Sequence, residues 1–483
     1  MEIEAIKKLI QRSFINVSKR NSDMNIADLY YRNENDILRN KRVGDKNADD
    51  KDKETNPLRN ADNRISHNWH QLLVDQKAAY GFTYPPQFDV DLANGKDNNE
   101  TEQLNQEIVT ILGDKYPNIA KNLCKKASNF GISWLHVWID EETKAFKYAI
   151  VDSRQIVPVW DKSLEQNLKG IFRTYEDIDD DGNVFNVTEY WNDTECSVYR
   201  TEKYVADDLD SLEEYNTIPL YFANTQVETN RFNHSFPGRI PFIPFPNNEL
   251  KTGDLKKTKA LIDVYDRVFS GFVNDVDDVQ EIIFVLTNYG GEDKQKFIND
   301  LKQYKTIKVD SNGEDKSGVD TLAIDIPIEA RNKILDITHN QIFVSGQGVD
   351  PQKELGNNNS GEALKYLYSL LELKAGDIET EFRLGFAKLI EFILVYLNKE
   401  SLIGKVQIKQ TWTRSSINND KEQAEIVASL ASVTSRENIA KANPIVDNWE
   451  DEIDLLDKED DDAGRMKNDY KAEEVVDLDG EEE

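Results

Sequence analysis

The residues whose types and spacing come closest to a metal site lie at positions 177–182. Aspartates occupy the first, third and fifth positions of a calcium-binding loop, and Gly182 occupies the sixth. The twelfth position holds Thr188, where such a loop needs a bidentate glutamate. The strands predicted on either side explain the same residues as an Asp-Gly hairpin turn. We favour the turn and expect no metal, but the sequence leaves open whether a divalent ion binds between Asp177 and Asp181.

Two histidines, His67 and His70, lie three residues apart on a predicted helix, a spacing that suits a pair of metal ligands. The nearest following carboxylate is Asp75, and no Cys or His follows at ligand distance. We interpret both histidines as surface or interface residues.

Enzyme motifs are missing from the sequence. Gly346-Gln-Gly348 and Tyr289-Gly-Gly291 lack the Lys-Ser/Thr pair of a phosphate-binding loop, and no Gly-x-Ser-x-Gly elbow occurs. The scattered carboxylates form no constellation that names a reaction. We therefore predict a protein with no catalytic residues and no cofactor, and an acidic metal-dependent hydrolase is the least favoured alternative.

A loop predicted at residues 344–359 holds three glycines, one proline and three consecutive asparagines. It has little apolar material to pack, so we expect it to be mobile. Its only cation is Lys353. A single ammonium among amides either touches phosphates weakly or is simply solvated, and the sequence favours neither interpretation.

Composition limits the partners of the chain. It has 483 residues, of which 90 are acidic and 59 basic, giving a formal net charge of −31. So negative a protein is poorly suited to clamping nucleic acid, although DNA can pass nearby without binding tightly. Cys124 and Cys196 are too few for a disulfide framework and are interpreted as reduced packing residues. No signal-peptide pattern occurs, and no apolar run is long enough to cross a bilayer, so we expect no membrane segment and synthesis inside the cell.

The first half of the chain changes from helices to strands. Helical periodicity covers residues 3–40, 63–80 and 103–130, and Pro117 is expected to break the last of these or to begin a new helix. Residues 41–63 are almost wholly polar and predict an exposed loop or a partly disordered segment. A period of two then predicts an antiparallel meander, which a proline-rich extended connector at 236–249 ends. The predicted strands cover residues 134–140, 147–152, 170–175, 184–191, 196–200 and 217–222.

A small α/β insert follows between two helices. The helices are predicted at 254–279 and 327–343, the second beginning on Pro327. The insert between them reads as a strand at 281–287, a turn, a helix at 293–304 and strands at 306–309 and 319–326. We therefore expect the two helices to lie side by side as a stalk that carries the insert.

A long helix begins at Ser360 and carries two apolar stripes, so we expect it to be packed on two sides. Such a helix suits a ring in which each subunit contacts both neighbours, although periodicity alone favours a buried helix in a large monomer. A strand at 406–412 and helices at 419–430 and 435–442 follow. From residue 450 onward the chain has 17 acidic and 4 basic residues, which predicts a disordered tail beyond about residue 457.

Eight segments, taken in order, resemble the portal proteins of tailed double-stranded-DNA bacteriophages, of the type found in long non-contractile-tailed phages of Gram-positive hosts. Together they span roughly residues 28–400. The segments are 30–38 (YYRNENDIL), 67–77 (HNWHQLLVDQK), 127–134 (ASNFGISW), 241–249 (PFIPFPNNE), 289–292 (YGGE), 318–322 (GVDTL), 326–330 (IPIEA) and 360–370 (SGEALKYLYSL).

The resemblance implies an α+β, multidomain portal fold that forms a ring, usually of twelve subunits. It divides the chain into a wing (1–253), two stem helices (254–280 and 326–343), a clip (281–325), a tunnel loop (344–359), a long wing helix (360–400), a crown (401–456) and an acidic disordered tail (457–483). The stalk and insert predicted above match the stem and the clip.

The implied function is the DNA channel at one capsid vertex, through which the viral genome is packaged and later ejected. The implied partners are the terminase large subunit, the head-tail adaptor, the scaffold and major capsid proteins, and double-stranded DNA without sequence specificity. The protein would be part of the virion and of the host cytoplasm during assembly. The alternative is a head-tail adaptor or another capsid structural protein. The implied site residues are Gln352, Lys353, Glu354, Asn357, Asn358 and Asn359 in the tunnel loop, and Asn288, Tyr289, Glu292 and Asp293 on the docking surface of the clip.

Overall fold

The computed structural model describes residues 16–39, 61–91, 98–202, 227–279, 283–287, 318–322, 327–350, 361–415, 434–442 and 455–458, with residues 9, 352, 429, 452 and 453. The chain divides into two compact units. Unit 1 comprises Met1–Asp350 and Leu373–Arg414, and unit 2 comprises Pro351–Glu372 and Ser415–Glu483.

Helices form the first layer of unit 1. They are α2 (Val17–Tyr31), α3 (Asp36–Arg39), α4 (Trp69–Phe82), α5 (Asn98–Leu112) and α6 (Tyr116–Phe130). Pro117 lies in the first turn of α6, which fits the predicted alternative that it begins a new helix, because a proline in the first turn costs no hydrogen bond. Gly131 ends α6 at φ 81°, in the left-handed region that favours glycine.

The helix predicted at 63–80 begins later than expected, at Trp69. The backbone N–H groups of Asn63, Ile65 and His67 donate instead to side chains of helix α7 (Leu255–Val279), at Asn274, Ser270 and Asp266. Donation by alternate residues holds this segment extended against α7. Helical periodicity cannot reveal such a segment, because its partners are distant in the sequence.

A three-stranded sheet packs against these helices in the order β3-β2-β9. Its strands are β2 (Ile132–Ile139), β3 (Phe146–Val151) and β9 (Phe242–Pro246), all antiparallel. Strand β9 corresponds to part of the predicted proline-rich connector. Pro244 and Pro246 are accommodated because β9 is an edge strand, where a missing N–H costs no ladder bond.

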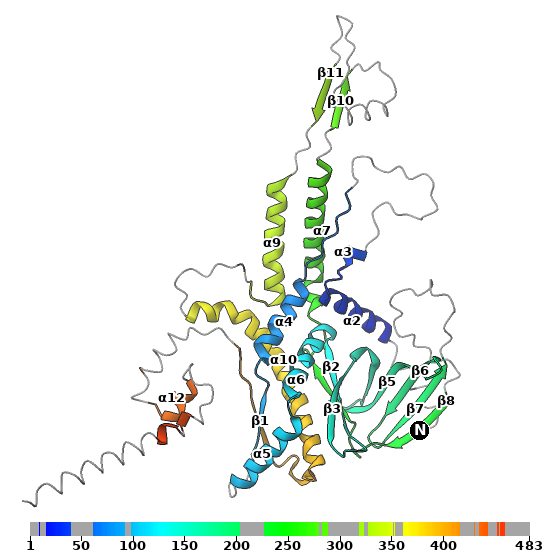
Figure 1. The fold of residues 1–483 in the computed structure, drawn as a ribbon, viewed down its shortest axis with the longest axis vertical. Coiled ribbons are helices and arrows are strands. Elements are labelled where there is room, and N and C mark those ends of the chain that lie inside the picture. Colours follow the sequence, from blue (N-terminus) through cyan, green and yellow to red (C-terminus); the bar gives the residue numbers. More distant parts are fainter. Residues whose placement is uncertain are drawn as a thin grey trace, which may run out of the picture. The chain divides into compact units, whose positions relative to one another are not determined.

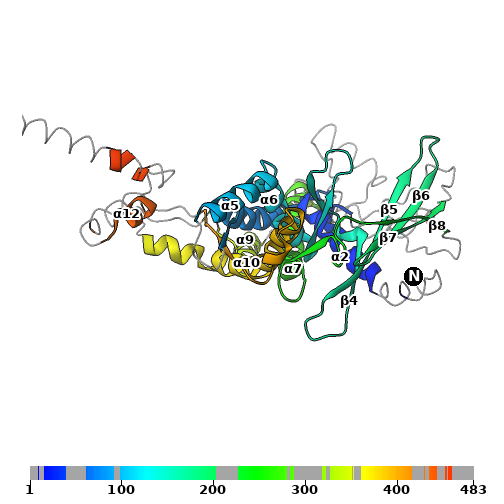
Figure 2. The same ribbon diagram turned by 90° about the horizontal axis from the view of Figure 1, so that it is seen from below.

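A five-stranded antiparallel meander forms the second sheet, in the order β4-β5-β6-β7-β8 (Figure 1). The strands are β4 (Ile156–Trp160), β5 (Leu168–Ile178), β6 (Val184–Trp191), β7 (Glu195–Glu202) and β8 (Val227–Asn233). The sequence did not predict β8, and the strand predicted at 217–222 lies outside the described residues. Viewed from below, the meander stands apart from helices α5 and α6 (Figure 2).

The turn between β5 and β6 confirms the hairpin interpretation of residues 177–182. Asp179 accepts hydrogen bonds from the backbone N–H groups of Asp181 (3.1 Å) and Asn183 (2.8 Å). Gly182 takes the left-handed conformation, at φ 84°. The turn chemistry therefore uses the residues that resemble a calcium loop, and within the described residues no group of three or more His, Cys, Asp or Glu could hold a metal ion.

The long helix α10 (Gly361–Tyr396) crosses from unit 2 into unit 1. Its unit 1 part supplies Phe382 and Phe386 to the main core, the hydrophobic cluster that α10 shares with helices α4, α5 and α6 and strands β2, β3 and β9. Both rings contact Phe245 of β9, with 5.0 Å between ring centroids. Gly385 allows this contact, because a Cβ at that position would lie 2.6 Å from the Phe245 ring. The predicted second stripe, through Leu370, Leu373, Phe386, Ile390 and Leu397, is buried only in part, since Phe386 and Ile390 are buried but Leu373 is exposed.

Helices α7 and α9 (Ile328–Gly346) lie side by side, and strands β10 (Ile283–Thr287) and β11 (Gly318–Leu322) pair antiparallel beyond their ends (Figure 1). The stalk and the first and last strands of its insert are as predicted. The helix predicted at 293–304 and the strand at 306–309 lie outside the described residues. Pro327 stands at the N-cap of α9 rather than inside its first turn.

The C-terminal part of unit 1 returns to the helical layer. Strand β12 (Gln407–Thr411), within the strand predicted at 406–412, pairs antiparallel with β1 (Gln87–Asp91), and Trp412 packs against the main core. Residues 407–411, within the segment that the resemblance assigns to the crown, thus share a sheet with the N-terminal region. In unit 2, helix α12 (Arg436–Ala442) matches the helix predicted at 435–442. The helix predicted at 419–430 and the end of the acidic tail lie outside the described residues, apart from Ser429.

Candidate functional site at the base of the stalk

The base of the stalk is where the predicted tunnel loop begins. Of the six site residues predicted in this loop, the structure describes Gln352, which is exposed; Lys353, Glu354, Asn357, Asn358 and Asn359 lie outside the described residues. The predicted clip residues Asn288, Tyr289, Glu292 and Asp293 also lie outside them. The roles of all these residues stay predictions.

The predicted start of the loop at residue 344 is wrong. Helix α9 continues to Gly346, and Gln347 caps it in the left-handed conformation at φ 53°. The N–H of Gly348 then donates to the carbonyl of Phe343 at 2.9 Å, which closes the helix end as in a Schellman motif. Composition alone cannot distinguish a glycine-rich helix end from a glycine-rich loop.

Residues 346–349 are fixed against helix α4, which corrects the expectation that this stretch is mobile. The Gln76 side chain donates to the Val349 carbonyl (2.7 Å) and accepts from its N–H (3.0 Å). Gly346 and Gly348 let Leu73 approach, because a Cβ on either would lie 2.5 or 2.3 Å from the Leu73 side chain. The two glycines therefore serve close packing.

A buried ionic cluster, which we call the stalk clamp, joins four elements at this base. It consists of Lys77 of α4, Asn247 after β9, Asp254 immediately before α7 and Lys374 of α10. Asp254 accepts from Lys77 at 3.3 Å, from Lys374 at 3.2 Å and from the Asn247 amide at 2.8 Å. Lys374 also donates to the carbonyl of Gly346 at 2.9 Å, the last residue of α9. The stalk clamp thus holds the start of one stalk helix and the end of the other.

The stalk clamp is electrostatically unbalanced, since its one carboxylate faces two ammonium groups. The two lysines, with the Asn247 amide, hold the pKa of Asp254 well below its usual range, although burial alone would raise it. Burial lowers the pKa of Lys374, and the attraction of Asp254 only partly offsets this. Each group has hydrogen-bond partners, so the cluster is stable only while all its members are in place.

The two histidines also lie at this base, and the interpretation of His70 as a surface residue is wrong. His70 is 1% exposed, and its Nε2 lies 2.8 Å from the side-chain oxygen of Asn129. Burial lowers the pKa of His70 to about 4. His67 lies 2.7 Å from the fully buried carboxylate of Asp266 on α7. His70 and Lys77 share one face of α4 with Leu73, at steps of three and four residues, and this is the signal in the sequence that could have indicated their burial.

Trp69, the first residue of α4, contacts both stalk helices. Its ring centroid lies 5.4 Å from that of Tyr265 on α7, and 5.2 and 5.8 Å from those of His339 and Phe343 on α9. Farther along the stalk, Arg331 of α9 pairs with Asp275 of α7. The stalk is therefore held at its base by an aromatic contact as well as by the stalk clamp.

Comparison with known families settles what kind of protein has this stalk. Residues 16–466 match the family described as phage portal protein, SPP1 Gp6-like. The chain belongs to this portal protein family.

Individual portal proteins extend the match over nearly the whole chain. The portal protein of Clostridium phage phiCD119 is 39% identical over 484 residues, covering 97% of this chain and 99% of that protein. The portal protein of Bacillus phage SPP1 is 31% identical over 465 residues, covering 94% of this chain and 87% of that protein. These matches confirm the predicted family and the Gram-positive hosts, and the tail type stays a prediction.

Two solved neck structures also align with part of the chain. The neck of an empty GTA particle, computed with C6 symmetry, matches with 11% identity and a TM-score of 0.44, covering 78% of this chain and 90% of that one. The neck of a native GTA particle with C12 symmetry matches with 10% identity and a TM-score of 0.41, covering 78% and 89%.

The two cysteines of the chain are packed in its interior. Cys124 and Cys196 are free and buried, as predicted, and burial raises the pKa of the Cys124 thiol to about 11. Among the described residues, no helix is long and apolar enough to cross a membrane.

Proposed function

We propose that this portal protein assembles into a homo-oligomeric ring of twelve subunits at one capsid vertex, and that the genome is packaged and later ejected through the ring. The stalk clamp is the observation that carries this proposal. A channel wall made of paired helices has to keep its position while DNA moves past it. The stalk clamp provides this stiffness by tying both helix ends to α4 and α10.

The division of labour along the chain follows from this assembly. Helices α7 and α9 form the stem, and the segment that contains β10 and β11 forms the clip. The clip docks the terminase large subunit and later the head-tail adaptor, through a surface that includes Asn288, Tyr289, Glu292 and Asp293. The N-terminal region up to residue 253, the unit 1 part of α10 and residues 401–414 together form the wing. The crown then begins after Arg414.

The tunnel loop follows the fixed segment 346–349 and contacts DNA through Gln352, Lys353, Glu354 and Asn357–Asn359. With one cation in the loop and a net charge of −31 over the chain, contact with phosphates is weak, and the duplex slides rather than binds. The protein performs no chemistry itself, so hydrolysis belongs to the motor that docks on the clip. Scaffold and major capsid proteins meet the outer surface during assembly in the host cytoplasm.

Negative-stain electron microscopy of the purified protein tests the assembly. We expect rings with a central hole wide enough for duplex DNA. Failure to form rings at any protein concentration or salt concentration would overturn the proposal and favour an adaptor role.

Deletion of residues 352–359 tests the tunnel loop. Because α9 is capped at Gln347 and residue 349 is bonded to Gln76, the deletion begins beyond the fixed segment. We expect rings to form and DNA packaging or retention to fail. Loss of ring assembly would show that the loop is structural instead.

A further inference from the structure

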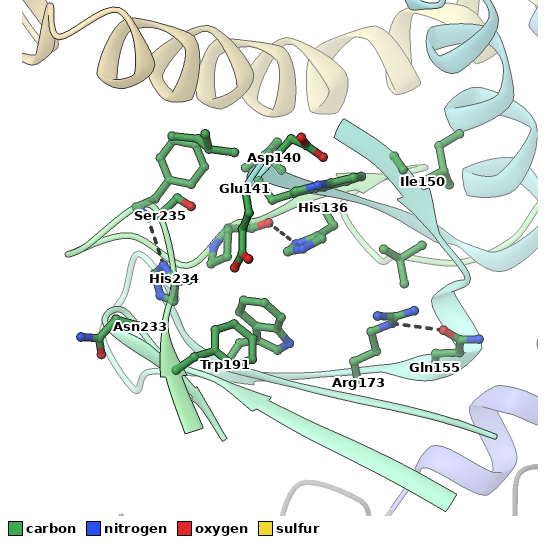
Figure 3. A pocket seen from close by; sticks show the side chains of 18 of the residues that line it. His136, Asp140, Glu141, Ile150, Gln155, Arg173, Trp191, Asn233, His234 and Ser235 are labelled. Atoms are coloured by element: carbon green, nitrogen blue, oxygen red, sulfur yellow. Dashed lines mark hydrogen bonds between the residues drawn. The ribbon is translucent and has the colours of Figure 1, made fainter. Parts of the chain in front are cut away.

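A pocket of about 860 Å³ lies between the three-stranded and the five-stranded sheets of unit 1. Strands β2 and β3 line it on one side, and strands β5, β6 and β8 line it on the other. We call it the inter-sheet pocket. Figure 3 shows Arg173 and Gln155 together at one end, His136 and Trp191 in the middle, and Asn233 and His234 at the other end.

The middle of the inter-sheet pocket is lined by aromatic rings, and the Glu141 side chain reaches it from the opposite side (Figure 3). Nδ1 of His136 donates to the Pro241 carbonyl at 2.8 Å, and the ring stacks on Trp138 with 5.4 Å between centroids. His234 is bonded through Nε2 to the Asn192 carbonyl at 2.9 Å. Burial lowers the pKa of both histidines, so the rings stay neutral at pH 7. This surface suits an apolar or aromatic group.

Arg173 is the one cation among the described residues that line the pocket, and its hydrogen bonds are all long. Its Nε donates to the Gln155 side-chain oxygen at 3.4 Å, and its Nη1 lies 3.5 Å from both carboxylate oxygens of Glu189. Glu189 has better donors in the Tyr175 hydroxyl (2.9 Å) and the Trp191 indole N–H (2.8 Å). The guanidinium is stacked on the Tyr175 ring at 4.5 Å, so its plane is held in position.

In this geometry the Arg173 guanidinium is held in place, but its N–H groups can still donate short hydrogen bonds to a ligand. An arginine fork is suited to two short hydrogen bonds with a carboxylate, each shorter than the 3.5 Å contacts that it makes with Glu189. The Gln155 amide N–H₂ lies beside it as a further donor. From the opposite side, Glu141 points into the pocket (Figure 3), and Asp140, Glu142 and Asp152 also line it. Asp152 pairs with Arg154 at 2.6 Å and Asp140 accepts from the Thr143 hydroxyl at 2.7 Å, whereas Glu141 faces the pocket and repels a second negative charge. The pocket therefore favours a single carboxylate attached to an apolar group.

We propose that the inter-sheet pocket binds the C-terminal residue of a partner polypeptide, with the terminal carboxylate on Arg173 and Gln155 and an apolar side chain against Trp191 and His136. A chain terminus is the occupant that fits, because it carries both groups on one residue, whereas an internal acidic residue separates its carboxylate from its apolar neighbours. Glu141 then faces the preceding residues of the partner and selects against acidic ones. This inference does not rest on ring assembly.

Calorimetric titration of the full chain tests the proposal with two peptides of the same sequence that end in phenylalanine, one with a free carboxylate and one amidated. We expect the acid to bind at least tenfold more tightly than the amide. Arg173→Gln should abolish that preference. Arg200→Gln, the same change on β7 of the same sheet but outside the pocket lining, should retain it.

A second variant does not depend on Arg173. Ala149→Leu, on the opposite wall, fills the pocket and should weaken both peptides. Equal binding of acid and amide, an unchanged preference in Arg173→Gln, or no binding of either peptide at millimolar concentration would each overturn the proposal. N-acetylphenylalanine should bind more weakly than the acid peptide; equal affinity would point to a small-molecule site and would contradict a polypeptide partner.

Discussion

The stalk clamp and the inter-sheet pocket both place charged side chains between packed elements, but the quality of the contacts differs. In the stalk clamp, Asp254 is bonded by Lys77, Lys374 and Asn247, and the surplus donor of Lys374 reaches a helix-end carbonyl at 2.9 Å. In the pocket, Arg173 has only contacts of 3.4–3.5 Å. The polar groups of the stalk clamp are saturated with hydrogen bonds and stabilise the fold, whereas Arg173 can still form hydrogen bonds to another molecule.

The largest effect should follow from Asp254→Asn in the stalk clamp. The substitution leaves Lys77 and Lys374 buried without a counter-charge, and breaking a buried ion pair in this way costs about 3–5 kcal/mol. Thermal or urea unfolding measures the loss. Glu400→Gln, which removes the exposed partner of Arg239, is the control and should cost less than about 1 kcal/mol. Equal losses for the two variants would mean that the stalk clamp contributes no more than a surface ion pair.

The same variant should change the acid limb of stability. The pKa of Asp254 is held below its unfolded value, so its contribution is present above about pH 4 and is lost as the pH falls further. The wild-type protein should therefore lose stability more steeply below pH 4 than Asp254→Asn does. Parallel acid limbs would contradict the ionised state of Asp254 in the folded protein.

Stability should also depend on pH between pH 6.5 and 4, because of His70 at the base of the stalk and His136 in the inter-sheet pocket. Burial lowers the pKa of His70 and of His136 to about 4, so the unfolded chain binds more protons in this window. Stability should fall as the pH falls, by up to about 1.4 kcal/mol per pH unit for each histidine. Unfolding curves of His70→Gln should have a shallower pH slope than wild type, whatever the absolute stability. An unchanged slope would mean that His70 is charged in the folded protein.

Much of the stalk region was predictable because its signals are local. Pro117 and Pro327 mark where helices start, and the order of helix, insert and helix indicated a stalk. The stalk clamp was not predictable, because Asp254 meets lysines that lie far away in the sequence on either side of it. A lysine within a helical pattern is normally interpreted as solvent-exposed. Only the position of Lys77 on the same helix face as His70 and Leu73 indicates that it is buried.

The inter-sheet pocket was still harder to foresee. The strands that carry His136, Arg173 and Trp191 were predicted, but their alternation shows only which side chains share a face of one strand. Which sheets oppose each other depends on the crossing from β8 to β9, and β8 was not predicted. The sequence does not show which two sheets face each other, and for this reason the pocket between them could not be predicted.

A smaller effect than in the stalk clamp should follow from Gly346→Ala. The new Cβ would lie 2.5 Å from the Leu73 side chain, and forcing apart packed elements typically costs about 1–3 kcal/mol. Gly376→Ala in α10 is the matched control: no described atom lies within 4 Å of its Cβ position, so the change should stabilise the helix by roughly 0.5–1 kcal/mol. Leu73→Ala should suppress the cost of Gly346→Ala in a double-mutant cycle. Additive effects would contradict the contact.

Arg173→Gln should change the free energy of unfolding least of all these variants. Its effect decides whether Arg173 stabilises the fold, as the stalk clamp does, or is available to bind a ligand. Hydrogen bonds of 3.4–3.5 Å are weak, and Glu189 keeps its bonds from Tyr175 and Trp191 when the guanidinium is removed. Partly exposed ion pairs contribute at most about 1 kcal/mol, so the midpoint of urea unfolding should barely move. A loss as large as that of Asp254→Asn would make Arg173 a structural cation, and the pocket would then be a second clamp rather than a binding site. Near-neutral stability with lost peptide discrimination is the combination that only a ligand-binding arginine explains.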